Sequence, residues 1–194
     1  ATEFNGKKLI DGTGGTLVEK CCHFFDLMNV IVRQRPLRVY ASGAADVNHR
    51  DERYDGAQPD ILDNAFAVVD FEGGARALLD LCMFAENSTN EMEIAATGDR
   101  GKVEAFVPAH RLVVTRRDRN EPTTVTFPMD ANLAKAGAHH GSTFFEHVAF
   151  RDAIRSGGKP VVSVSDGALA VAMGLAGERS ARLGRPVDLA ELGF

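Results

Sequence analysis

The middle of the chain, from residue 37 to residue 127, is a series of short apolar runs separated by turn-forming residues. Seven runs have the length and composition of β-strands: 37–42, 64–71, 75–84, 91–97, 102–107, 110–115 and 123–127. Gly73-Gly74 connects the second and third runs, and Gly98-Asp99-Arg100-Gly101 connects the fourth and fifth, as in β-hairpins. This pattern predicts an antiparallel meander of about seven strands.

Helical periodicity precedes the meander. Apolar residues recur at spacings of three and four over about 17 positions, at Leu17, Cys21, Phe25, Met28 and Val32. Thr16 followed three residues later by Glu19 matches a capping box, and Pro36 lies just beyond the stripe. These signals predict one continuous helix that begins near Thr16.

Two further helices are predicted after the meander. Thr143 and Ser163 each have an acidic residue three positions later, which matches capping boxes at the beginning of helices over 143–155 and 164–183. The order of one helix, many strands and two helices favours an α+β fold. In such a fold the helices pack on one face of an open, mostly antiparallel β-sheet.

The other face of the predicted sheet needs its own explanation. The run from Ala77 to Phe84 hardly alternates between apolar and polar residues, so we expect an exposed apolar face that serves in dimerisation or domain docking. Cys82 in this run is interpreted as a buried small hydrophobe. With three cysteines in 194 residues, two of them adjacent, a disulfide framework is excluded.

Composition and motifs exclude several classes of protein. Hydrophobic residues make up 44% of the chain, which excludes low-hydrophobicity disorder, and the net charge of -5 argues against a nucleic-acid partner. No apolar run approaches the roughly 18–20 residues that span a membrane, and no leader segment is recognisable, so we expect a cytoplasmic protein or a piece of one. No P-loop, serine-hydrolase or zinc-site motif is present, so no metal is expected.

The first predicted helix carries the densest group of polar residues that could do chemistry. On a regular helix Glu19, His23 and Asp26 share one face, because they are separated by four and three positions. A carboxylate one turn from an imidazole can fix its tautomer and raise its basicity, which suits proton transfer from a hydroxyl. The same pattern is common on solvent-exposed helices, so spacing alone leaves both interpretations open.

Two other histidine groups are candidates. His139-His140-Gly141 lies just before a predicted helix, where a histidine can contact a ligand oxygen, but it is also compatible with a simple polar loop. His49 and its charged neighbours are interpreted as a solvent-exposed loop.

Both ends of the chain resemble the glucose–fructose oxidoreductase, inositol dehydrogenase and rhizopine-catabolism (Gfo/Idh/MocA) family. Residues 14–27 match its Gly-Gly step, an acidic residue, a histidine four positions later and an aspartate three beyond that. The C-terminal part matches the family's usual ending, with Gly158-Lys159-Pro160, Asp166-Gly167 and Gly184-Arg185-Pro186-Val187. Together the two stretches bracket essentially the whole chain.

The resemblance implies the C-terminal domain of an oxidoreductase that uses NAD or NADP and acts on a sugar, polyol or related hydroxy compound. Residues 1–15 would lead in from a missing Rossmann domain that binds most of the cofactor. Residues 16–194 would form the substrate-binding domain and the homo-oligomer interface, through the open sheet face. Substrate choice would depend on loops such as 128–141.

The resemblance also implies roles for individual residues. His23 would be the proton donor or acceptor and Glu19 would orient it, although the family more often has Asp at the position of Glu19. Lys20 and His140 would contact the substrate. The alternative is a non-catalytic oligomerisation or ligand-binding module of the same fold. Because Gly12, Gly14 and Gly15 do not complete a dinucleotide-binding motif, the chain alone is expected neither to bind dinucleotide tightly nor to transfer hydride.

Overall fold

The computed structural model describes residues 14–54, 56–128, 132 and 139–194. The chain divides into two compact units, one of Ala1–Glu86 with Val162–Phe194 and one of Asn87–Val161. Most of the predicted lead-in at 1–15 and most of the loop at 128–141 lie outside the described residues.

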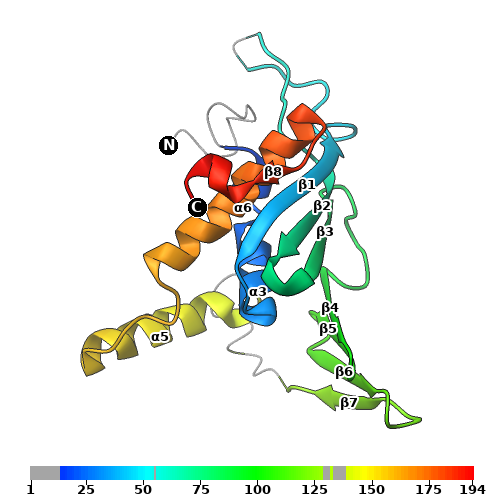
Figure 1. Cartoon of the computed structure of the whole chain (residues 1–194), viewed down its shortest axis with the longest axis vertical. Helices are drawn as coiled ribbons and strands as arrows, with labels where there is room; N and C mark the ends of the chain where they lie inside the picture. Colours follow the sequence, from blue (N-terminus) through cyan, green and yellow to red (C-terminus); the bar gives the residue numbers. More distant parts are fainter. Residues whose placement is uncertain (1–13, 55, 129–131, 133–138) are drawn as a thin grey trace. The chain divides into compact units, whose positions relative to one another are not determined.

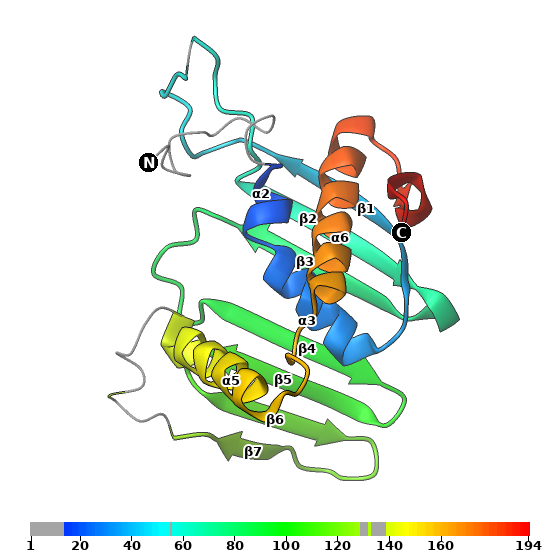
Figure 2. The same cartoon turned by 90° about the vertical axis from the view of Figure 1, so that its left-hand side faces the viewer.

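The first unit is a four-stranded antiparallel sheet with three helices on one face, as Figures 1 and 2 show. The strand order is β3-β2-β1-β8, with β1 at Pro36–Ala44, β2 at Asn64–Phe71, β3 at Arg76–Cys82 and β8 at Val187–Asp188. The helices are α2 at Thr16–Glu19, α3 at Cys22–Val32 and α6 at Val164–Leu183. Short 3-10 turns, Glu72–Gly74 and Leu189–Leu192, follow β2 and β8.

The core of this unit lies between the sheet and the helices. Alternate residues of β2 are buried (Ala65, Ala67, Val69 and Phe71), and they meet Leu17, Phe25 and Met173 of the three helices. Each large apolar side chain buried in this way stabilises the fold by about 1.5–3 kcal/mol. The fold class predicted from the sequence, α+β with helices on one face of an open antiparallel sheet, is confirmed.

Two glycines of α6 let this helix pack closely against Leu17 of α2. A Cβ atom at Gly174 would lie 2.6 Å from the carbonyl oxygen of Leu17, and one at Gly177 would lie 2.9 Å from its Cδ1. Larger residues at these positions would push α2 away from α6.

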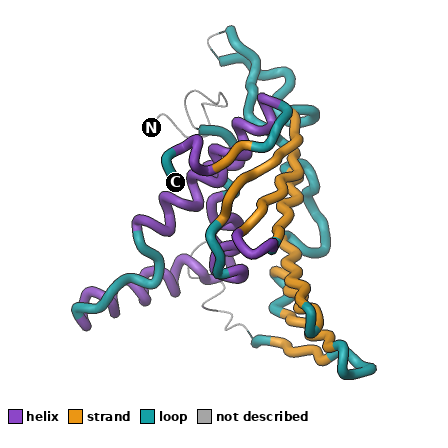
Figure 3. Tube along the Cα trace, in the orientation of Figure 1, coloured by secondary structure: helices purple, strands orange, loops and turns teal. Residues whose placement is uncertain are grey.

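The second unit is a separate antiparallel sheet followed by a helix (Figure 3). Its strands lie in sequence order: β4 at Met92–Gly98, β5 at Gly101–Val107, β6 at Arg111–Arg116 and β7 at Thr123–Thr126. A 3-10 turn at His139–Gly141 leads into α5 at Ser142–Ser156. All seven predicted strands are therefore confirmed, and they belong to two sheets. In the described part of the chain, no helix is long and apolar enough to cross a membrane.

The predicted continuous helix over 16–32 is wrong, because the chain forms two helices with an interruption at Lys20–Cys21. The N–H of Cys21 donates to the carbonyl oxygen of Thr16 at 3.3 Å, five residues back, so the turn is wider than a regular helical turn. The Thr16 cap is also wrong: its hydroxyl donates to the carbonyl oxygen of Leu62 at 2.5 Å, and Gly15 is the N-cap.

Of the other two predicted capping boxes, one is confirmed. Ser163 Oγ accepts from the N–H of Asp166, whose carboxylate accepts from the N–H of Ser163. The box at Thr143 is wrong, since α5 begins one residue earlier, after Gly141, without a side-chain cap.

The prediction that Cys82 is buried is wrong as well. Along β3 the side chains of Leu79 and Leu81 are buried, whereas those of Leu78, Asp80 and Cys82 are exposed. The strand alternates in the structure even though its sequence does not, because it presents an apolar residue to each face.

Candidate functional site

The structure places three of the four predicted site residues on one short stretch of the first unit. Glu19 is the last residue of α2, Lys20 lies in the interruption, and His23 is the second residue of α3. The side chains of Lys20 and His23 are exposed, and that of Glu19 is partly buried. His23 makes no hydrogen bond or ion pair with any residue that the structure describes.

The interruption changes the relationship between Glu19 and His23. On a regular helix these two residues would lie one above the other, but the wide turn at Lys20–Cys21 separates the two helices. No hydrogen bond joins their side chains in the described structure. Burial raises the pKa of the Glu19 carboxyl above its ordinary value, and the ammonium group of Lys20 partly opposes this rise. Glu19 therefore holds its proton more readily than a solvated glutamate does.

A buried carboxylate from α6 fixes the beginning of α2. The side chain of Glu178 is 2% exposed, and its Oε1 accepts a 2.9 Å hydrogen bond from the backbone N–H of Leu17. Burial raises the pKa of Glu178, while the Leu17 N–H and the charge of Arg182 lower it by smaller amounts. A Cβ atom at Gly15 would lie 2.3 Å from the same carboxylate oxygen, so glycine leaves the space that Glu178 fills.

The second anchor of α2 is the hydrogen bond from Thr16 to Leu62, at the end of the loop that connects β1 to β2. This loop is held by Asp63, which is 4% exposed. Its carboxylate accepts the backbone N–H groups of three consecutive residues, Asp46, Val47 and Asn48, at 2.7–3.1 Å. Burial raises the pKa of Asp63, but these bonds and one from the Asn64 amide outweigh it and keep the pKa below its ordinary value.

The same loop carries a hydrogen-bonded network. Glu52 accepts a bond of 2.5 Å from the hydroxyl of Tyr54 and lies 2.7 Å from Nδ1 of His49. The bond to Glu52 raises the pKa of the Tyr54 hydroxyl. These side chains are only partly exposed, whereas the sequence interpretation expected a solvent-exposed loop.

Three of these residues were not found by sequence reasoning. Glu178 directly follows ten small and apolar residues, Ala168 to Gly177, which is a usable signal for a buried acid. Asp63, directly before a strand, and Glu52, in a charged loop, have no comparable signal.

The fourth predicted site residue, His140, belongs to the second unit. Its backbone is left-handed (φ 54°), its Nε2 lies 2.8 Å from Oε2 of Glu91, and its ring meets that of His110 edge to face at 6.3 Å between centroids. His140 is therefore held by protein groups, and its contact with a substrate stays a prediction.

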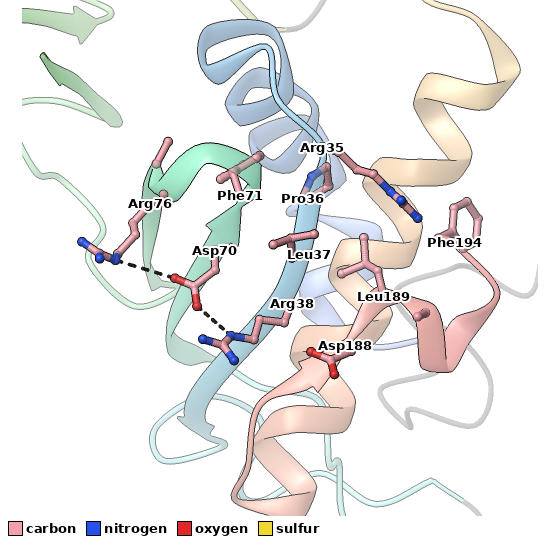
Figure 4. Close-up of a pocket in the computed structure, with 13 residues that line it drawn as sticks. Arg35, Pro36, Leu37, Arg38, Asp70, Phe71, Arg76, Asp188, Leu189 and Phe194 are labelled. Carbon is pink, nitrogen blue, oxygen red and sulfur yellow. Dashed lines mark hydrogen bonds and ion pairs between the residues drawn. The ribbon is translucent and has the colours of Figure 1, made fainter.

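The residues that line a cavity of about 600 Å³ in the first unit are drawn in Figure 4, and none of them belongs to α2. The cavity lies where β1 begins and β2 ends. Leu62, which anchors α2, comes just before the first residue of β2 and therefore lies near the opposite end of that strand. The charged rim of the cavity consists of Arg35, Arg38, Asp70, Arg76 and Asp188. Asp70 pairs with Arg38 at 2.7 Å and with Arg76 at 3.8 Å, so one carboxylate is shared by two guanidinium groups and the rim keeps one more positive than negative charge. None of the predicted site residues lines this cavity.

The described residues do not form a cradle for a dinucleotide. Every strand pair among them is antiparallel, so they contain no β-α-β unit of the kind that binds NAD. No group of three or more His, Cys, Asp or Glu side chains in the same part of the chain could hold a metal ion.

Comparison with known proteins identifies a matching family. The model of the Gfo/Idh/MocA oxidoreductase family's C-terminal alpha/beta domain matches residues 11–189. No curated protein matches the chain significantly.

Solved structures give the same result for the fold. An oxidoreductase domain protein from Kribbella flavida has a TM-score of 0.76 at 19% identity, over 94% of this chain and 54% of that one. Levoglucosan dehydrogenase in complex with NADH and levoglucosan has a TM-score of 0.74 at 22% identity, over 91% and 51%. An Agrobacterium radiobacter oxidoreductase in complex with NAD+, L-tartaric acid and magnesium has a TM-score of 0.69 at 20% identity, over 96% and 55%. The chain thus spans about half the length of each of these proteins.

Proposed function

Since the chain belongs to the Gfo/Idh/MocA oxidoreductase family and contains its C-terminal domain, we propose that it is the substrate-binding half of a nicotinamide-dependent dehydrogenase. The substrate class is a sugar, a polyol or a related hydroxy compound. Two similar structures support this class, because the ligands named in them, levoglucosan and L-tartaric acid, both carry hydroxyl groups. The observation that carries the proposal is the exposed imidazole of His23, which has no hydrogen bond or ion pair with any described residue and follows Glu19 by four positions.

In the proposed reaction, oxidation of a substrate hydroxyl releases a proton and a hydride. NAD or NADP, bound by a domain outside this sequence, supplies the hydride chemistry. Nε2 of His23, the ring nitrogen farthest from the helix backbone, takes the hydroxyl proton, and it returns a proton in the reverse direction. Glu19 orients the imidazole, while Lys20 and His140 contact substrate oxygens.

The test is made in the full-length polypeptide that carries this domain. His23→Ala should lower kcat by about 10²–10⁴-fold with a much smaller change in KM, which is the usual contribution of a general acid–base. Lys20→Ala should raise KM instead, and serves as the comparison variant in the interruption just before α3. An unchanged kcat in His23→Ala would show that His23 is not the proton acceptor.

We also propose that two copies of the chain associate through the open face of β1, β2 and β3. The side chains of Phe66 and Leu78 on this face are 57% and 59% exposed, and that of Tyr40 is 44% exposed. Exposed apolar patches of this kind are typical of protein interfaces. This face also supports the second candidate function, a non-catalytic oligomerisation module, which a full-length polypeptide without dehydrogenase activity would favour.

A cytoplasmic location is proposed too. The free thiols of Cys21, Cys22 and Cys82 support it, since reduced cysteines are usual in that compartment.

A further inference from the structure

The second unit gathers three side chains that can take part in proton exchange at one end of its sheet. At this end β4 and β6 begin, and β5 and β7 end. Glu91 directly precedes β4, and His110 directly precedes β6. His140 lies next to both of them, in the turn before α5. The topology therefore brings one carboxylate and two imidazoles together from three separate segments.

The backbone around His140 has a conformation that few side chains adopt. His139 and His140 have φ values of 58° and 54°, and His110 has a φ of 46°. This left-handed region is disfavoured for residues other than glycine, so contacts around the three residues must hold it. The hydroxyl of Ser142 donates to the carbonyl oxygen of His139. The N–H of Phe127 donates to the carbonyl oxygen of His110 at 2.8 Å.

The contact with Glu91 decides which nitrogen of the His140 ring carries a proton. Nε2 of His140 lies 2.8 Å from Oε2 of Glu91, which is hydrogen-bond distance. Because an ionised carboxylate can only accept hydrogen bonds, Nε2 must be the donor. In the neutral ring Nδ1 then has a lone pair and accepts hydrogen bonds. No residue in the described part of the second unit donates a hydrogen bond to this nitrogen.

The His140 ring is held from a second direction as well. The rings of His110 and His140 meet at an angle of 83°, an edge-to-face arrangement that is favourable for aromatic pairs. The side chain of His140 is 34% exposed, so solvent reaches part of the ring. The side chain of Glu91 is 63% exposed, so its replacement by alanine leaves no buried cavity.

An acceptor nitrogen selects its ligand by hydrogen-bond chemistry. A hydroxyl group can donate its proton to the lone pair of Nδ1, whereas an ionised carboxylate has no proton to donate. A hydroxyl of a sugar or polyol therefore fits the neutral ring of His140, and a carboxylate does not.

We propose that Glu91 is a positioning residue that holds His140 in the Nε2–H tautomer, so that Nδ1 accepts a hydrogen bond from a substrate hydroxyl. This inference rests on the proposed function, in which His140 contacts the substrate. It adds the atom that makes the contact, the direction of the hydrogen bond and the residue that fixes both.

Nitrogen-15 NMR of the 194-residue chain with labelled histidine measures the tautomer directly. At a pH of about 8.5, where a solvated imidazole is neutral, His140 should have a protonated Nε2 and an unprotonated Nδ1. Glu91→Ala should give a mixture of the two tautomers, which moves the two nitrogen shifts toward each other. His140→Gln identifies the signals. A protonated Nδ1 in the wild type, or unchanged shifts in Glu91→Ala, would overturn the proposal.

Glu93→Ala is the matched control. It removes a carboxylate two residues further along, whose Oε1 accepts a 2.8 Å hydrogen bond from the Asn90 amide. The His140 shifts in this variant should equal those of the wild type. A change as large as that in Glu91→Ala would show an effect of net charge, and the role of Glu91 would be wrong.

Steady-state kinetics of the full-length polypeptide test the contact with the substrate. Glu91→Ala and His140→Gln should each raise KM by about 3–10-fold, with kcat within about twofold, because one hydrogen bond to bound substrate is lost. The double variant should raise KM no further than His140→Gln alone, since Glu91 acts through His140. Effects that multiply in the double variant would contradict the positioning role.

The outcomes separate this inference from the proposed function. If His23→Ala lowers kcat but Glu91→Ala and His140→Gln leave KM unchanged, the proposed reaction stands and this inference is wrong. If the polypeptide has no dehydrogenase activity, the proposed function and the substrate contact are both wrong. The tautomer in the 194-residue chain then decides only whether Glu91 positions the ring.

Discussion

The backbone N–H of Leu17 and the carboxylate of Glu178 are joined by a 2.9 Å hydrogen bond between residues 161 positions apart. The bond ties the first helix of the described chain to the last. It also places a carboxylate in a nearly closed environment, with the Cα of Gly15 on one side and the buried thiol of Cys21 close by. Burial, and to a smaller extent the charge of Glu178, raises the pKa of Cys21 to about 12.

The raised pKa of Glu178 predicts a pH-dependent contribution to stability. The unfolded chain releases this proton first, so the free energy of unfolding should fall as the pH rises from about 4.3, the ordinary value, through the pKa of the folded state. Glu178→Gln keeps an acceptor for Leu17 but does not titrate. Its stability relative to the wild type should therefore increase over this pH range, as measured by urea denaturation at a series of pH values. A difference that is constant with pH would contradict this.

Gly15→Ala should destabilise the domain. Gly15 has φ 90°, and a Cβ atom there would lie 2.3 Å from Oε1 of Glu178. The combined backbone strain and displacement of a buried carboxylate should lower the free energy of unfolding by about 2–4 kcal/mol. Gly74→Ala is the matched control, because its φ is 88° and nothing lies within 4 Å of the added Cβ. Equal losses in the two variants would show that the contact with Glu178 contributes nothing.

Asp63→Asn should loosen the loop between β1 and β2. An amide cannot accept three backbone N–H bonds as a carboxylate does, so we expect a loss of about 2–4 kcal/mol in the free energy of unfolding at neutral pH. Because the folded pKa of Asp63 is lowered, this contribution is present above its ordinary value of about 3.9 and is lost as the pH falls through the folded value. Asp51→Asn, at an exposed position of the same loop, should have little effect. Thermal denaturation at neutral and acidic pH measures both variants.

The 194-residue chain should not bind dinucleotides tightly, because its described strands provide no β-α-β unit for the pyrophosphate. Isothermal titration with NAD, NADH, NADP and NADPH should show no saturation at micromolar concentration. Levoglucosan dehydrogenase, which has been solved in complex with NADH, is the positive control. Micromolar binding to the isolated chain would contradict the proposal that a separate domain binds the cofactor.

The strands could be predicted because their signals are local. Gly73-Gly74 and the turn from Gly98 to Gly101 separate apolar runs, and the two hairpins appear where these turns predict them. The capping box at Ser163 is equally local, since both of its bonds lie within four residues. Periodicity also predicted the right helical region at the beginning of the chain.

The errors have causes that are distant in sequence. The spacing of apolar residues cannot show that Glu178 takes the N–H of Leu17 or that Leu62 takes the hydroxyl of Thr16. The single helix and its cap were therefore predicted wrongly. The prediction that Cys82 is buried failed because an apolar run does not reveal which of its residues face the helices.

The link between Glu178 and the residues that begin α2 has a consequence for engineering chimeric enzymes. Glu178, in the last helix, fixes the backbone direction at Gly15 and Leu17. In a chimera joined near Gly14, the orientation of α2 would therefore depend on α6. If the proposed function holds, joining this domain to a different cofactor-binding domain should succeed only when Gly15, Leu17 and the whole of α6 come from one parent.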